Sequence, residues 1–405
     1  MAWENLGTLY HYELKKIVRR RTLWITLALC ISMIAFSVIS QLFGAYYVDG
    51  ELTDTHYHMY TVDRAYREEL SGRVIDDELL QEMVAAYRKI PAGTARYTLT
   101  KEYQVYARLY NDIFGIVRNW TGMGFESLVN WNANEEDLYA LRRTNLEKDW
   151  QELCLTDAEK AFWIEQESHI AKPITYFYHD GYSTLVGIFQ TVGILMFLLI
   201  AITLSSVFSD EHTRRTDQLI LSSMKGKGIA YWAKLLAGGT VSAVCALILS
   251  LAAATFSLGI YGATGFHAAL QLEVHFYSWS LSLGEACLIM YGALIITSLL
   301  AGVFVMVLSE LLHSNIGALA VSTGLILLAM FVGSLPDEYR VIAQIWDSLP
   351  MVFLSPWNVF SVRPITLLGY CLTSWQVMPI IYIICSFLIA ILGKHVFGRY
   401  QVSGR

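Results

Sequence analysis

The sequence predicts an all-α integral membrane protein with six transmembrane helices, an N-terminal interfacial helix and a helical extracellular domain. The first reason is composition: hydrophobic residues make up 55% of the 405 residues and charged residues only 16%, whereas about a quarter of an ordinary soluble domain is charged. The second is that six apolar runs are long enough to cross a hydrocarbon core, which takes roughly 20 helical residues. The third is that Lys and Arg gather at alternate connections between these runs.

The N-terminal residues 1–22 are expected to form an amphipathic helix before the first span. Apolar and aromatic residues recur there at steps of three or four, and basic residues occupy the other faces. Such a helix lies in the membrane interface with its basic side toward anionic headgroups. The alternative is that the basic cluster only sets the topology. The residues expected to contact the membrane surface are Trp3, Leu6, Tyr10, Lys15, Lys16 and Arg19.

The apolar runs define six expected spans and the connections between them. A signal peptide is rejected for the first run, because it is too long and no clear cleavage site follows it. Outer loops are expected at 262–284 and 336–374, and the second of these is rich in Pro and apolar residues, which suits short helices that dip into the membrane. The expected spans are 23–48, 181–208, 229–261, 285–309, 315–335 and 375–393.

The basic residues give one consistent orientation. They concentrate in residues 1–22, in the connection 209–228 and in the tail 394–405, which alternation places on one side. Because cytoplasmic connections carry the excess of Lys and Arg, both termini are expected in the cytoplasm, at the plasma membrane. The absence of an extracellular disulfide is compatible with a bacterial membrane: only Cys154 lies in the polar segment 49–180, so that segment cannot hold an internal disulfide.

Residues 49–180, called the insert below, are expected to form an extracellular helical domain. The insert holds 14 Lys and Arg against 24 Asp and Glu, a net charge of −10, while the whole chain carries −6. A basic footprint for nucleic acid is therefore absent. Helical patterns run through 76–87, 103–114 and 157–173.

Two features of the insert leave alternatives open. A metal site is conceivable at four histidines, although solvated histidines near the membrane surface are the simpler interpretation, and no metal is expected. Its many Tyr and Trp side chains form either an aromatic binding wall or, more commonly, core and interface contacts. The four histidines are His56, His58, His169 and His179.

A row of small residues in the third expected span indicates close helix packing. These residues repeat at every fourth position, which lets two helix backbones approach each other. Packing within the chain is the simpler interpretation, and contact with a second subunit is the alternative. The residues are Gly238, Ser242, Ala246, Ser250 and Ala254.

The connection 209–228 carries the most specific pattern. It begins with acidic and ends with basic residues, as a helix with a complemented dipole does, and its apolar Leu219 and Leu221 suggest a partner surface. A span ending in Phe208-x-x-Glu211, a short Leu-rich turn, a Gly/Lys stretch and a span opening with Lys234 resemble the membrane subunits of ABC-2 type ATP-binding-cassette exporters.

The resemblance covers essentially the whole chain except the insert. The six spans, the interfacial helix at the N-terminus and the Pro-containing hairpin at 336–374 match the same family. The insert resembles that of subfamilies with a large extracellular domain between the first two spans.

The resemblance implies that 209–228 form a coupling helix that docks on cytosolic ATPase subunits, with ATP and Mg bound in that partner and no cofactor bound directly by this chain. It also implies a second permease subunit, identical or related, beside membrane lipid. The docking residues implied are Phe208, Glu211, Arg214, Arg215, Thr216, Asp217, Leu219 and Leu221.

The expected function is that of an exporter permease that moves an amphipathic peptide, lipid or drug with ATP hydrolysed by the separate ATPase chain. The chain itself is not expected to be an enzyme, since it has no Gly-x-x-x-x-Gly-Lys-Ser/Thr loop. The alternative is a non-transporting receptor or scaffold whose extracellular domain binds a ligand. A secondary carrier is disfavoured, because the spans lack the buried charges that such carriers use.

Overall fold

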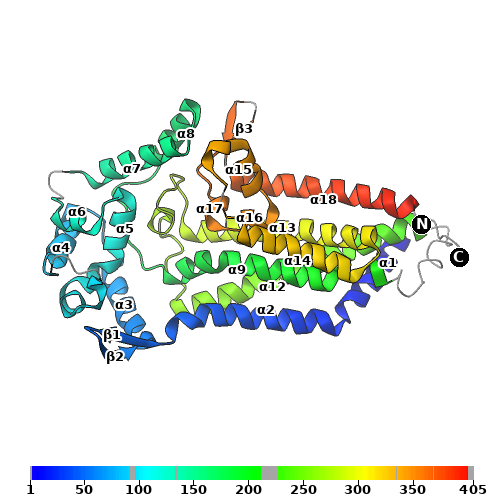
Figure 1. The fold of residues 1–405 in the computed structure, drawn as a ribbon, viewed down its shortest axis with the longest axis horizontal. Helices are drawn as coiled ribbons and strands as arrows, with labels where there is room; N and C mark the ends of the chain where they lie inside the picture. Colours follow the sequence, from blue (N-terminus) through cyan, green and yellow to red (C-terminus); the bar gives the residue numbers. More distant parts are fainter. Residues whose placement is uncertain are drawn as a thin grey trace.

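The protein is mostly helical and elongated. A bundle of long helices runs along the molecule, with the insert at one end and α1 (Ala2–Val18) at the other (Figure 1). We call these the domain end and the terminal end. The computed structural model describes residues 2–91, 96–132, 136–210, 226–333, 335–367 and 369–399.

Five helices within the described residues are long and apolar enough to cross a membrane, which indicates a multi-pass membrane protein. The expected span 315–335 is represented by the shorter apolar helix α14 (Asn315–Phe331), whose 17 residues lie at the lower limit for a membrane-spanning helix. The five longer helices are α2 (Arg21–Ile39), α9 (Asp180–Leu204), α12 (Tyr231–Tyr261), α13 (Leu283–Leu312) and α18 (Ser374–Arg399).

The all-α prediction was wrong at two short β-hairpins. The first pairs β1 (Ala45–Val48) with β2 (Glu51–Thr55), so the first span ends earlier than the predicted 23–48. Asp49 and Gly50 both have positive φ at the turn, and Asp-Gly is a strong signal for such a hairpin. The second pairs β3 (Ile365–Leu367) with β4 (Tyr370–Leu372).

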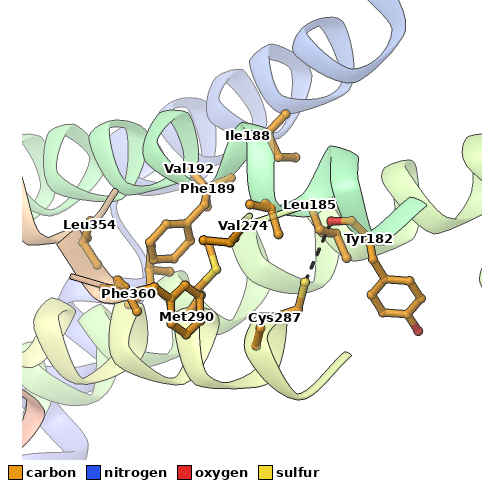
Figure 2. Packing of buried hydrophobic residues seen from close by; sticks show 14 of the residues in the cluster. Tyr182, Leu185, Ile188, Phe189, Val192, Val274, Cys287, Met290, Leu354 and Phe360 are labelled. Atoms are coloured by element: carbon orange, nitrogen blue, oxygen red, sulfur yellow. Dashed lines mark hydrogen bonds between the residues drawn. The ribbon is translucent and has the colours of Figure 1, made fainter. Parts of the chain in front are cut away.

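Helices α9 and α13 form the centre of the bundle. In their most apolar segments 61% of the residues are buried, against 22% in α18 and 28% in α2 and α12. Figure 2 shows this core at the domain end, where Phe189 and Val192 of α9 face Met290 of α13. A methyl group added at Gly193 would lie 3.1 Å from Leu354, so the connection before α18 packs directly on α9.

Helices lie at the predicted patterns 76–87 and 157–173, and each begins at a capping residue, although the pattern 103–114 is broken. Asp76 accepts a hydrogen bond from the Leu79 amide at 3.1 Å, and Thr156 and Glu159 form a capping box. Residues 103–110 form irregular helical turns before α5. The helices are α3 (His56–Leu70), α4 (Asp77–Tyr87), α5 (Asn111–Thr121), α6 (Phe125–Asn130), α7 (Leu138–Glu152) and α8 (Asp157–Ser168).

Aromatic side chains form the core of the insert. The rings of Tyr87 and Phe114 stack with centroids 3.9 Å apart, and those of Tyr97 and Phe125 stack at 4.4 Å. Tyr87 is fully buried. In this cluster the aromatic residues therefore act as packing residues, and the binding-wall alternative does not apply to them.

The Pro-rich segment before α18 contains short helices, as the sequence predicted, followed by the β3–β4 pair. In Figure 1 they lie at the domain end of the bundle, beside α8 of the insert. Proline occupies the first turn of two of them, where its missing N–H costs nothing. The helices are α15 (Arg340–Asp347), α16 (Pro350–Phe353) and α17 (Pro356–Val359), and we call the segment 336–373 the hairpin.

Candidate functional site

The terminal end of the bundle holds a buried polar cluster that joins three helices. The Ser205 hydroxyl donates to Asn315 at the start of α14 at 2.5 Å, and the Ser205 carbonyl accepts from Ser309 of α13. The Ser209 amide donates to the Ser309 hydroxyl at 3.3 Å. Because buried polar groups need partners, these bonds fix the ends of α9, α13 and α14 relative to one another.

Phe208 begins the connection that the resemblance assigns to docking, and it lies inside the protein. Its side chain is only 1% exposed, and its ring centroid lies 5.7 Å from that of Tyr231 and 5.9 Å from that of Phe397. The Tyr231 hydroxyl donates to the Ala390 carbonyl of α18 at 2.7 Å. Phe208 therefore anchors the start of the connection on α12 and α18.

A buried ion pair ties α1 to the same place. The Lys234 side chain of α12 is 1% exposed, and its Nζ lies 3.2 Å from Glu13 Oε1 of α1. The same ammonium lies 5.7 Å from the centroid of the Phe208 ring, within the range of a cation–π contact. A buried ammonium requires such partners, since its desolvation is costly.

A second ion pair holds Asp210, the last described residue before 211–225. Arg20, which joins α1 to α2, contacts Asp210 with 3.1 Å between Nη2 and Oδ2. Arg20 also donates to Ser206. After the gap, the π-helical turn Gly226–Ala230 packs against α1 and leads into α12.

One flank of 211–225 is thus attached to Arg20, between α1 and α2, and the other packs against α1. We call Glu13, Arg20, Phe208, Asp210, Tyr231 and Lys234 the anchor cluster. A force applied to 211–225 would act on α1, α9 and α12 through these contacts. The other residues implied in docking, which are Glu211, Arg214, Arg215, Thr216, Asp217, Leu219 and Leu221, lie outside the described residues.

Helix α1 places part of its apolar stripe against protein. The Tyr10 hydroxyl lies 3.1 Å from the Thr240 hydroxyl of α12, and Ile17 is 1% exposed. Leu6 is half-buried, whereas Lys15, Lys16 and Arg19 are exposed. The side chain of Trp3 lies outside the described ones. The stripe expected to face lipid therefore also serves to dock α1 on the bundle.

The small-residue row of α12 packs within the chain. Ser242 and Ala246 are buried, and Ser250 is nearly so. A methyl group at Gly238 would overlap Met306 of α13, and one at Gly302 of α13 would overlap Ser242. Ala254, at the end of the row, is half-buried. These contacts agree with close packing of α12 on α13.

The domain end is held by a buried arginine. Arg142 of α7 is 0% exposed and lies 3.3 Å from Glu167 of α8. It also donates to the backbone carbonyl of His275 at 2.5 Å and to that of Tyr277 at 3.5 Å. Lys172 contacts Glu167 at 2.9 Å. One guanidinium therefore joins the insert to the loop between α12 and α13.

Two tryptophans and a third ion pair extend this junction. Trp120 Nε1 donates to the Gln271 carbonyl at 3.0 Å, and Trp163 Nε1 donates to the Val362 carbonyl of the hairpin at 2.7 Å. Arg340 of α15 pairs with Glu159 of α8. The insert is therefore fixed both to the loop after α12 and to the hairpin.

These contacts shift the pKa values of the junction. Burial alone would raise the pKa of Glu167, but Arg142 and Lys172 outweigh it and hold the pKa below its ordinary range. The pKa of Glu159 is lowered in the same way, by Arg340 against burial. Burial, followed by the charge of Arg142, lowers the pKa of His275. The two carboxylates therefore remain charged at neutral pH.

The sequence did not indicate which charged residues join the insert to the rest of the protein, such as Arg142 with Glu167 and Arg340 with Glu159. Arg142 stands beside Arg143, and only one of the two is buried, a distinction that depends on the distant loop around His275. Among the described residues, no group of three or more His, Cys, Asp or Glu side chains is placed to hold a metal ion.

The histidines of the insert have separate surroundings. His58 lies 3.5 Å from Asp54 on the surface, whereas His179 is buried and its Nδ1 lies 2.6 Å from the Phe177 carbonyl.

No family model matches the chain, and none of the curated proteins matches it. The architecture and the contacts described above are therefore the observations that bear on function.

Proposed function

We propose that the chain is the membrane subunit of an ABC-2 type exporter, which moves an amphipathic peptide, lipid or drug with ATP hydrolysed by a separate cytosolic ATPase. In this proposal α14 is the sixth span, the terminal end faces the cytoplasm, and the insert is extracellular. Two copies, or this chain and a related one, form the translocation unit. The order of helices and the distribution of basic residues support this arrangement.

The anchor cluster carries the proposal. An ATPase can bias the permease only if its nucleotide states favour different permease conformations. A docking segment must then be attached firmly to helices that move. Asp210 is held by Arg20 at 3.1 Å, and the buried Phe208 beside it packs on α12 and α18. These contacts give 211–225 a stiff connection to the bundle.

The chemistry of the bundle supports an amphipathic cargo. Its long helices are strongly apolar, and the ionisable groups described in them lie near their ends, as Lys234 and Glu310 do. A polar or ionic cargo would need charged or unwound sites at the bilayer midplane. An apolar route suits a cargo that carries its own hydrophobic surface.

Copurification of the ATPase tests the proposal. The tagged chain is isolated in mild detergent from its native host, and associated ATPase is measured by mass spectrometry and by ATP hydrolysis. We expect a nucleotide-binding partner with the wild type and its loss with Glu211→Arg combined with Leu219→Arg. A double change of similar size at the opposite end, Glu126→Arg with Leu52→Arg, should leave the partner bound.

The same experiment decides between the exporter and the receptor. If no ATPase accompanies the wild-type chain under any nucleotide condition, the exporter proposal fails and the receptor or scaffold alternative is favoured. If the ATPase remains at full stoichiometry with both docking changes, the assignment of 209–228 as the coupling segment is wrong.

A further inference from the structure

A cavity lies within the bundle, away from the anchor cluster. It has a volume of about 390 Å³ and is enclosed by α9, α13, α14, α18 and the first part of the hairpin. Phe197, Phe304 and Ile389 contribute to its walls. This volume lies in the range of small-molecule sites, which are mostly apolar with a few placed polar groups.

The walls are apolar apart from two hydrogen-bonding side chains. Among the described lining residues, only Ser322 of α14 and Trp346 of α15 carry a side-chain oxygen or nitrogen. Within the part of the chain that the structure describes, Ser322 Oγ and Trp346 Nε1 are buried without a hydrogen-bond partner. Buried polar groups are normally paired, so each such exception needs a reason.

Other helical serines show what Ser322 lacks. Ser242 and Ser250 of α12 donate to the carbonyls four residues earlier, at 3.0 Å and 2.8 Å. Ser322 is 5% exposed, yet it makes no such bond. An acceptor supplied from the cavity would remove the cost of leaving this donor unpaired, after a rotation about χ1 of the serine.

The cavity opens toward the side of the bundle. Its rim residues Leu325, Leu328 and Leu349 are 47%, 50% and 39% exposed. Helix α14 is buried only along Ala318, Ser322 and Ile326, so it rests on the bundle through a narrow stripe. In a membrane this opening between α14 and the hairpin would face the lipid chains.

We propose that the cavity binds a fatty-acyl ester that enters from the bilayer, with its apolar chain along Phe197, Phe304 and Ile389. Because Trp346 Nε1 and Ser322 Oγ are both buried, the ester oxygens accept hydrogen bonds from them once these side chains turn toward the cavity. A charged group is disfavoured, since no charged side chain is among the described lining residues and burial of an unpaired charge is costly. The inference needs no ATPase partner, so it can fail or hold independently of the exporter proposal.

Photolabelling of the full chain tests the site. The protein alone is placed in nanodiscs of phosphatidylcholine that bears a diazirine on the acyl chain, and labelled peptides are mapped by mass spectrometry. We expect labels on peptides that contain Phe304 and Ile389. Ala329→Phe, which fills the cavity, should reduce them at least tenfold. Val321→Phe, on the exposed side of the same helix, should leave them unchanged.

The donor is tested by a matched pair of serine changes. Ser322→Ala should weaken labelling by about two- to tenfold, the effect of one lost hydrogen bond. Ser257→Ala should have no effect, although Ser257 Oγ on α12 is also buried without a hydrogen-bond partner among the described residues. Ser257 does not line the cavity.

Two sources of the ester are distinguished by a second probe. A diazirine-bearing fatty-acid methyl ester is added to nanodiscs of unlabelled lipid. Labelling by both probes supports a bilayer phospholipid, and labelling by the methyl ester alone assigns the site to a free monoacyl ester. The proposal is overturned if Ala329→Phe labels like the wild type. It is also overturned if Ala329→Phe leaves the labelling unchanged and alters the oligomeric state instead. The cavity would then bind a side chain of a partner subunit rather than an ester.

Discussion

The two ends of the bundle each contain a buried cation, and they hold it differently. At the domain end, Arg142 and Glu167 have side chains 0% and 6% exposed, and the guanidinium also reaches two backbone carbonyls. At the terminal end, Lys234 is 1% exposed, but its partner Glu13 is 19% exposed. The first pair is enclosed by three segments, whereas Glu13 of the second pair also lies 3.6 Å from Lys16, whose side chain is 41% exposed.

This difference follows the chemistry of the two cations. A guanidinium presents several donors in a fixed plane, and an ammonium is a compact charge on a flexible chain. Arg142 therefore suits a rigid mount between the insert and the bundle. Lys234 shares its partner Glu13 with Lys16, which lies 3.6 Å from the other carboxylate oxygen. We interpret the domain end as a fixed platform and the terminal end as the part that responds to the docking segment.

The largest expected effect is the loss of the Arg142 mount. Arg142→Met leaves Glu167 buried with only Lys172 beside it, and we expect a loss of about 3 kcal/mol in stability. Thermal unfolding of the purified protein, followed by tryptophan fluorescence, measures it. Arg143→Met, on a side chain that is 54% exposed, is the control, and equal effects of the two changes would contradict the mount.

Acid should weaken the same end. The folded-state pKa of Glu167 lies below its ordinary value of 4.5, so its contribution is complete above that value and is lost as pH falls through the lower pKa. Protection of the loop around His275 against hydrogen exchange, after correction for the slower intrinsic exchange at low pH, should fall as pH decreases, by less than in Arg142→Met. Glu167→Gln should remove this pH dependence. An unchanged acid response in Glu167→Gln would show that another group is responsible.

Loss of the Lys234 pair should cost less. In Lys234→Met, Glu13 keeps its contact with Lys16, so we expect about 1 kcal/mol rather than the larger cost of a fully enclosed pair. The double change Lys234→Met with Glu13→Gln should recover part of the loss. Unfolding measured beside Lys15→Met, on an exposed side chain of the same helix, checks the value. A loss as large as that of Arg142→Met would remove the distinction between the two ends.

The smallest effect is expected where α1 docks on α12. Tyr10→Phe removes the hydroxyl that lies 3.1 Å from Thr240, and we expect about 0.5–1 kcal/mol. Tyr12→Phe, on a side chain that is 65% exposed, should change nothing measurable. If Tyr10→Phe has no effect either, the α1 contact contributes through its apolar residues alone.

Local signals in the sequence predicted the helices well. Asp76 and Thr156 mark the starts of α4 and α8, and the long apolar runs mark the bundle. The Asp49-Gly50 pair also signalled a hairpin, but the apolar run before it concealed the end of α2. What could not be predicted was which of Arg142 and Arg143 is buried, because the loop that encloses Arg142 lies more than a hundred residues away.

The candidate site shows the same limit. The resemblance drew attention to the stretch after α9, and Phe208 lies at its start. An apolar residue in a charged connection fits either a partner surface or a buried anchor, and only the positions of Tyr231 and Phe397 distinguish the two. In the sequence, Lys234 indicated only the topology. Its pairing with Glu13 could not be predicted, because it depends on how α1 folds back on α12.

We propose that the anchor cluster transmits ATPase motion to the bundle. It is tested most directly with Phe208→Ala in vesicles that contain the chain and its copurified ATPase, by measuring ATPase stoichiometry and ATP-dependent export of a fluorescent amphiphile. We expect full stoichiometry, because Phe208 is buried, and at least a tenfold loss of export. Wild-type export by Phe208→Ala would contradict the claim.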